Sequence, residues 1–123
     1  TIHTFEVSAH FLIRRDGELI QYVSTQNRAW HAGASNWRGQ TRCNDFSVGI
    51  ELEGCDSKPY TAAQYEQLAA LTQALRERYP RINSVAGHHE IAPARKTDPG
   101  ACFEWARFEY QAKIPAEARK SAS

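Results

Sequence analysis

The segment from residue 87 to residue 100, GHHEIAPARKTDPG, gathers two histidines, a lysine and an aspartate into a short stretch that two prolines stiffen. Imidazole and carboxylate groups are common zinc ligands, and a catalytic zinc usually has three protein ligands and one open position for water. One of His88 and His89, together with Asp98, could therefore form part of a zinc site. Neighbouring strand residues point to opposite faces, so both histidines cannot face one site. The spacing is also typical of a polar surface loop.

Two further charged residues could act on a hydrolytic water. Glu51 lies on the polar side of SVGIELEG, in which Val48, Ile50 and Leu52 form the apolar side. A carboxylate at such a position could serve as a general base, or it could line the solvated face of a half-exposed sheet. Lys96 could stabilise the oxyanion that forms when water adds to a carbonyl, or it could be an ordinary solvated lysine.

The elements that would position these residues begin with a hairpin. EVSAHFLIRRDGELIQYV alternates apolar and polar residues on both sides of Asp16-Gly17, which predicts two strands joined by a turn. Residues 24–46 are polar, contain glycine and hold two of the three tryptophans. A connection of that length is usually a functional loop or a disordered one, and its aromatic residues favour the functional loop.

The second half of the chain predicts two helices. Thr61 is a suitable N-cap, and Gln64 stands at the capping-box position. An apolar stripe follows at helical spacing, and Pro80 ends the helix. The stripe consists of Tyr65, Leu68, Leu71, Leu75 and Tyr79.

NSVAGHHEI, residues 83–91, predicts a short strand that leads into the histidine segment. A shorter helix with Trp105 and Phe108 is expected over about residues 103–111, and a polar, flexible tail over residues 115–123. The order strand, strand, loop, strand, helix, strand, helix predicts an α/β fold with a mixed central sheet flanked by helices. A length of 123 residues suits one domain, residues 1–123.

Composition excludes several classes of protein. The 15 basic residues are scattered, and the formal net charge is +1, which argues against a nucleic-acid partner. No apolar run approaches the ~20 residues that span a bilayer. Cys43, Cys55 and Cys102 are widely spaced, which argues against a disulfide framework or a thiolate zinc knuckle and fits a reducing compartment. Two interpretations of the cysteines stay open: one of them could be catalytic, or all three could be buried or incidental thiols.

Several blocks together resemble the AmpD-type N-acetylmuramoyl-L-alanine amidases of the type 2 amidase and peptidoglycan-recognition superfamily. The blocks are VSAHFLIRRDG, RAWHAG, CNDFSVGIELEG, YTAAQYEQLAALTQAL and GHHEIAPARKTDPG, which run in order over about residues 7–108. The resemblance implies a Zn²⁺ enzyme that cleaves the amide between the lactyl group of 1,6-anhydro-N-acetylmuramic acid and L-alanine. It also implies a cytoplasmic role in peptidoglycan recycling. We expect a monomer that binds muropeptides and has no membrane partner.

The resemblance assigns a role to each candidate. The histidine after glycine in GHHEIAP matches a zinc ligand, which selects His88 over His89. Asp98 of KTDPG matches a second zinc ligand. Glu51, the first glutamate of IELEG, matches the catalytic base, and Lys96 matches the lysine that stabilises the transition state.

Two more residues match positions that line the substrate groove of this family. They are Trp30 in AWHAG and Arg42 before CNDF. An indole can cover the face of a sugar ring, and a guanidinium can bind a peptide carboxylate with two hydrogen bonds. The alternative for Trp30 is a core residue that anchors its loop.

The sequence departs from the family pattern at two places. The family's first zinc ligand is a histidine on a strand upstream of VSAH, and His10 matches a structural histidine instead. We therefore expect the third ligand, with its strand, to lie upstream of Thr1, unless His3 or His31 replaces it. Glu6 stands where many relatives carry a basic residue, which affects the expected peptide preference.

The absence of that histidine leaves a second interpretation open. The chain could be a non-catalytic muropeptide-binding module or an inactive fragment, because two ligands make a weak zinc site. A soluble α/β domain that shares only the architecture is a third interpretation. Glu51, Lys96 and Asp98 together favour the enzyme, since a module that only binds does not need them.

Overall fold

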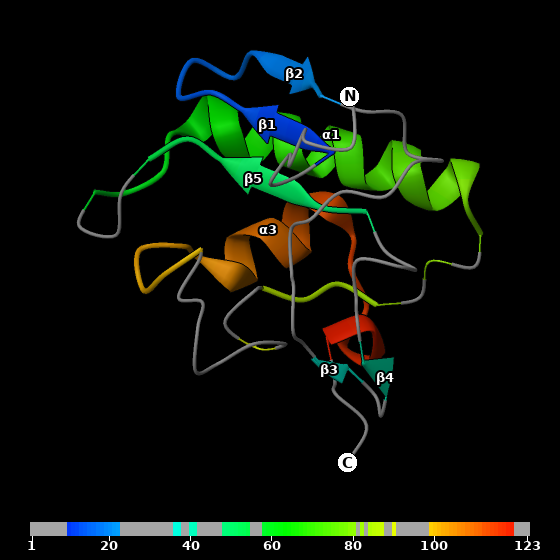
Figure 1. The fold of residues 1–123 in the computed structure, drawn as a ribbon. Coiled ribbons are helices and arrows are strands. Elements are labelled where there is room, and N and C mark those ends of the chain that lie inside the picture. Colours follow the sequence, from blue (N-terminus) through cyan, green and yellow to red (C-terminus); the bar gives the residue numbers. More distant parts are fainter. Residues whose placement is uncertain are drawn as a thin grey trace.

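A computed structural model describes residues 10–22, 36–37, 40–41, 48–54, 58–80, 82, 84–87, 90 and 99–119. A small sheet lies against helix α1 (Ala62–Arg78), and helix α3 (Trp105–Ala112) packs on α1. Figure 1 shows α1 crossing behind the sheet and α3 below strand β5. The predicted α/β fold, with a mixed sheet and flanking helices, is confirmed.

The sheet consists of three short strands in the order β2-β1-β5. They are β1 (Phe11–Ile13), β2 (Leu19–Gln21) and β5 (Ile50–Leu52). Strand β1 pairs antiparallel with β2 and parallel with β5, so the sheet is mixed. Within the predicted long connection, β3 (Asn36–Trp37) and β4 (Gln40–Thr41) form a separate antiparallel pair.

The predicted turn between β1 and β2 forms at Asp16-Gly17. The Asp16 carboxylate accepts a hydrogen bond from the Glu18 N–H at 2.9 Å, and the Arg14 carbonyl accepts one from the Gly17 N–H at 2.8 Å. Gly17 has a φ of +91°, a conformation that L side chains rarely adopt. The turn therefore needs glycine at this position.

Helix α1 begins and ends where the sequence predicts. The Thr61 hydroxyl accepts a hydrogen bond from the Gln64 N–H at 3.2 Å, while the Gln64 amide oxygen accepts one from the Thr61 N–H at 3.0 Å. This reciprocal pair is the predicted capping box. The stripe residues Tyr65, Leu68 and Leu71 are buried.

The hydrophobic core lies between the sheet, α1 and α3. Its aromatic centre is Phe103, which stacks on Tyr65 with 5.4 Å between ring centroids and meets Phe108 at 5.8 Å. Helix α3 begins at Trp105, two residues after the predicted start, because Phe103 is turned into the core before the helix begins. The Tyr65 hydroxyl accepts a hydrogen bond from the Glu104 N–H at 2.8 Å.

In the second half of the chain, one sequence prediction is wrong and a second one differs from the structure over four residues. Residues 84–87, within the strand predicted at 83–91, are not a strand. The Val85 N–H donates instead to the carbonyl of Ala118 at 2.7 Å. Within the tail expected over residues 115–123, Ala116–Arg119 form the 3-10 helix η3, in which Ala118 is buried against the core, and residues 120–123 lie outside the described residues. Figure 1 shows this helix in red below α3.

None of the helices in the described part of the chain is long and apolar enough to cross a membrane.

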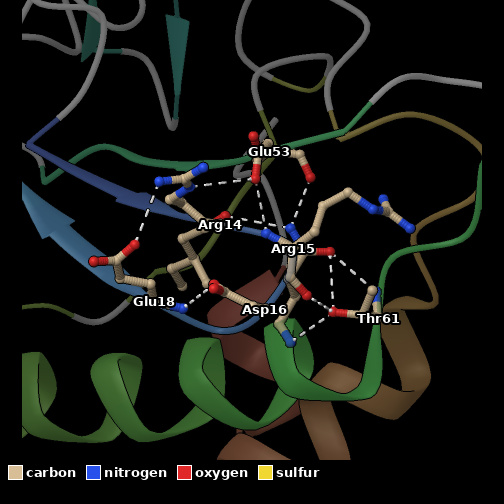
Figure 2. A network of polar contacts seen from close by, with 8 residues as sticks. Arg14, Arg15, Asp16, Glu18, Glu53 and Thr61 are labelled. Carbon is tan, nitrogen blue, oxygen red and sulfur yellow. Dashed lines mark hydrogen bonds and ion pairs between the residues drawn. The ribbon is translucent and has the colours of Figure 1, made fainter.

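A polar network joins the β1–β2 turn to the end of β5 and the start of α1 (Figure 2). The Arg15 N–H donates to the Glu53 carboxylate at 2.9 Å, and the Thr61 hydroxyl donates to the Arg15 carbonyl. Gln64, which is fully buried, donates from its side-chain amide to the carbonyls of Ile13 at 3.2 Å and Glu53 at 2.7 Å. The Gln64 side chain thereby links helix α1 to the end of strand β1 and to the residue that follows strand β5.

Replacing Gln64 with Ala should lower the free energy of unfolding by about 2–4 kcal/mol, because the change removes a cap and the two hydrogen bonds that the buried amide donates to the carbonyls of Ile13 and Glu53. Urea denaturation of the purified chain measures this change. Gln73→Ala, on the same helix, should stay within about 0.5 kcal/mol of the wild type. Equal losses from both variants would contradict a special role for the buried amide.

Burial raises the pKa of the Tyr65 phenol above its ordinary value of 10.0. The folded state therefore retains a proton that the unfolded chain loses, and the stabilisation is complete below about pH 10 and is lost as the pH rises through the folded pKa. We expect Tyr65→Phe to be less stable at pH 8 but to lose less stability between about pH 9 and about pH 11. Tyr110→Phe, whose side chain is 86% exposed, should follow the wild type in the same titration by urea unfolding. Parallel decline of all three would refute the assignment.

Candidate active site

Glu51 is the central residue of β5 and is half-buried. Its register partner on β1 is Leu12, whose own partner on β2 is Ile20. Register partners share one face of a sheet, and successive residues of a strand alternate between faces. Glu51 therefore lies on the same face as Leu12 and Ile20.

The opposite face of the sheet carries the core. Phe11 and Ile13 are buried there, and Ile50 and Leu52 pack against the same core. The predicted alternation of SVGIELEG is thus confirmed, with its apolar residues toward the helices. Glu51 points to the face away from the core and lies on a rigid strand, which suits a group that must be placed accurately on a substrate.

Both ends of the Glu51 strand are fixed by hydrogen bonds. Before it, the Gly49 N–H donates to Nδ1 of His10 at 3.0 Å, and His10 is fully buried. After it, the Glu53 N–H donates to the Ile13 carbonyl at 2.9 Å. His10 therefore holds the backbone of the strand next to Glu51, which agrees with the structural role that we expected for it.

The predicted zinc ligands His88 and Asp98, and the predicted catalytic Lys96, lie outside the described residues, but the chain that flanks them is described. Gly87 and Glu90 bond to each other twice: the Gly87 N–H donates to the Glu90 carboxylate at 2.9 Å, and the Glu90 N–H donates to the Gly87 carbonyl at 3.0 Å.

On the far side of the segment, the Tyr60 hydroxyl donates to the carbonyl of Pro99 at 2.7 Å. Tyr60 is buried and precedes the N-cap of α1. Before the segment, the Val85 N–H donates to the carbonyl of the buried Ala118, so the chain is attached to the folded body of the protein on both sides of the predicted zinc ligands.

The predicted groove residues Trp30 and Arg42 also lie outside the described residues, as do His3, His31 and Glu6. Arg42 directly follows β4 in the sequence. Within the ranges that the structure describes, no three His, Cys, Asp or Glu side chains form a group that could hold a metal ion. One imidazole and one carboxylate, as in His88 and Asp98, are donors of the type that zinc takes.

Of the cysteines, the structure describes Cys102, which is half-buried. Cys43 and Cys55 lie in the ranges that the structure leaves undescribed.

Sequence patterns gave no role to Tyr60, Glu90 or Arg119, although these residues hold the flanks of the predicted site. Each acts through a partner 29 to 39 positions away, so no local spacing marks the contact. The nearest available signal was the position of Glu90, two residues after His88 in GHHEIAP.

Comparison with known proteins identifies relatives over most of the chain. Residues 1–101 match the family model described as N-acetylmuramoyl-L-alanine amidase. The chain is 66% identical over 103 residues to the 1,6-anhydro-N-acetylmuramyl-L-alanine amidase AmpD of Citrobacter freundii, which covers 83% of this chain and 55% of that protein. The chain thus spans about half the length of this curated relative.

Two solved structures share the fold. The crystal structure of a selenomethionine derivative of AmpD superposes with a TM-score of 0.83 at 61% identity, covering 89% of this chain and 62% of the other. The amidase AmiD from Escherichia coli, in complex with the substrate anhydro-N-acetylmuramic acid-L-Ala-D-gamma-Glu-L-Lys, superposes with a TM-score of 0.79 at 38% identity. That match covers 87% of this chain and 48% of AmiD.

Proposed function

Because the chain belongs to the N-acetylmuramoyl-L-alanine amidase family, we propose that it hydrolyses the amide between 1,6-anhydro-N-acetylmuramic acid and L-alanine in muropeptides. The observation that carries the proposal is Glu51, a carboxylate on a strand fixed at both ends, on the sheet face away from the core. The substrate in the AmiD complex, an anhydromuramyl peptide, supports the substrate class. We further propose a cytoplasmic, monomeric enzyme of peptidoglycan recycling.

In this proposal each residue has a separate role in amide hydrolysis. Glu51 accepts a proton from the attacking water and delivers it to the nitrogen of the leaving L-alanine. The Lys96 ammonium stabilises the negative charge that develops on the carbonyl oxygen. Trp30 covers the sugar ring, and Arg42 binds the carboxylate of the stem peptide.

We propose that His88 and Asp98 contribute ligands to a zinc ion. A zinc ion at such a site polarises the amide carbonyl and lowers the pKa of water. The hydrogen bonds that flank the two ligands, at Gly87, Glu90 and Pro99, support a preorganised arrangement because they fix the chain on both sides. Glu51 and Lys96 remain the groups that move the proton and balance the charge.

Replacing Glu51 with Gln should reduce turnover of an anhydromuramyl tripeptide by at least ~10²-fold, because the amide cannot accept the proton. Affinity for the same tripeptide, measured by calorimetric titration, should change less than about threefold. Glu66→Gln, at an exposed position on α1, is the control and should keep full turnover. Turnover of the Glu51 variant within tenfold of the wild type would remove Glu51 from the role of base.

Replacing Asp98 with Ala should remove zinc and activity together. Elemental analysis should find about one zinc per wild-type chain and much less in the variant, because a lost ligand weakens the site. Asp16→Ala, which alters the β1–β2 turn, should keep its zinc. Lost activity with full zinc content would contradict the ligand role.

A wild-type chain that binds muropeptides but stays metal-free at saturating zinc would favour the non-catalytic binding module. The same result would leave the fold and the family membership unchanged, since neither depends on the metal.

A further inference from the structure

We propose that Arg119, at the end of η3, is a positioning residue that holds the Gly87–Glu90 segment and so sets the place of His88. The inference rests on the proposed function, in which His88 is a zinc ligand. It assigns a role to a part of the chain whose sequence predicted only a polar tail.

Arg119 binds a side chain of this segment and, at the same time, the backbone two residues before it. Its Nη1 donates to the Glu90 carboxylate at 2.5 Å and to the Val85 carbonyl at 3.0 Å. Its Nε donates to the Glu109 carboxylate of α3 at 3.2 Å. The Arg119 side chain is only 16% exposed and that of Glu90 23%, so water screens this ion pair less than it screens a surface pair.

The aromatic core fixes the orientation of the guanidinium. Its Cζ lies 3.4 Å from the centroid of the Trp105 ring, so the group stacks on the indole. Trp105 in turn packs edge-on against Phe103, with 4.8 Å between ring centroids. Contact with the Trp105 ring therefore restricts the position of the guanidinium that binds Glu90.

The same Glu90 oxygen that accepts from Arg119 also accepts from the Gly87 N–H. Together with the bond from the Glu90 N–H to the Gly87 carbonyl, this links Gly87 to Glu90 twice, and His88 and His89 lie between these two residues in the sequence. A histidine ligand is only as well placed as the backbone that carries it, and groups that orient metal ligands strongly affect metal affinity.

The 3-10 helix that carries Arg119 is itself attached to the same segment. The Ala118 carbonyl accepts a hydrogen bond from the Val85 N–H at 2.7 Å, and Ala118 is 1% exposed. Val85 is thus held through both its N–H and its carbonyl by consecutive residues of η3. Two hydrogen bonds to the Val85 backbone and one ion pair with Glu90 thus connect η3 to the chain on both sides of His88 in the sequence.

The test replaces Arg119 with Met, which keeps the stem and removes the charge and the donors. Arg107→Met is the matched control. Arg107 also lies over a buried ring, 4.3 Å from the Tyr65 centroid, and forms an ion pair with Glu104 at 3.6 Å, but among the described residues its polar contacts do not include residues 84–90. Arg119→Lys restores the charge but not the fork or the stacking.

Two readouts are compared. Amide hydrogen exchange in the zinc-free protein should accelerate at least tenfold at Gly87 and Glu90 in Arg119→Met, and stay unchanged at Ile13. Competition with a chelator, at a temperature where all variants are folded, should show zinc affinity reduced about 10–100-fold. The exchange rates and zinc affinity of Arg119→Lys should lie between those of the wild type and Arg119→Met. Both quantities should stay within about threefold of the wild type in Arg107→Met. If Arg119→Met does not fold, Glu90→Gln serves as the second variant with the same expectations.

Three other outcomes would each contradict a different step of the inference. Unchanged exchange at Gly87 and Glu90 shows that Arg119 does not anchor the segment. Faster exchange with unchanged zinc affinity shows an anchor that does not position the ligand. A wild-type chain that binds no zinc overturns the proposed function, and the positioning role with it, before any variant is compared.

Discussion

One buried amide, that of Gln64, connects the parts of the molecule on which the candidate site depends. A neutral polar side chain without exposure must find partners for its donors and its acceptor, since an unpartnered buried group costs about 1–3 kcal/mol. Gln64 finds them at the N-cap of α1, at the end of β1 and just after β5. The strand that carries Glu51 is therefore held in register by the helix that carries the core.

The same principle recurs around the histidine segment. Tyr60 holds the Pro99 carbonyl, and Arg119 holds Glu90 and Val85, so side chains of the folded body bind the irregular backbone on both sides of His88, Lys96 and Asp98. Backbone groups outside helices and strands need such partners when water is excluded. The protein meets this need with side chains that hold the chain at residues 85, 90 and 99.

The sequence predicted the elements whose signals are local. The capping box of α1 and the Asp16-Gly17 turn each depend on residues within four positions of one another, so their patterns identify them. The helical period predicted the buried face of α1, and the alternation in SVGIELEG placed Glu51 on the face away from the core.

The elements that depend on distant partners were missed or displaced. Nothing in the local sequence indicates that Ala118 is buried or that Val85 bonds to η3 rather than to a strand. For the site itself, residue spacing gave candidates, and the family resemblance selected His88 over His89. The structure gives the position of Glu51 and of the residues that flank the histidine segment, while the roles of all six assigned residues remain predictions.

The parallel pairing of β1 with β5 has a consequence for how the protein folds. Phe11 pairs with Ile50, so the chain must close a loop of nearly forty residues before the strand that carries Glu51 can join the sheet. Loop closure of this kind is entropically slow compared with helix formation, and parallel pairs cannot begin from a tight turn. We therefore expect α1 and the β1–β2 hairpin to form early and β5 to dock late. On that pathway, early intermediates carry an open β1 edge where the strand with Glu51 will later sit.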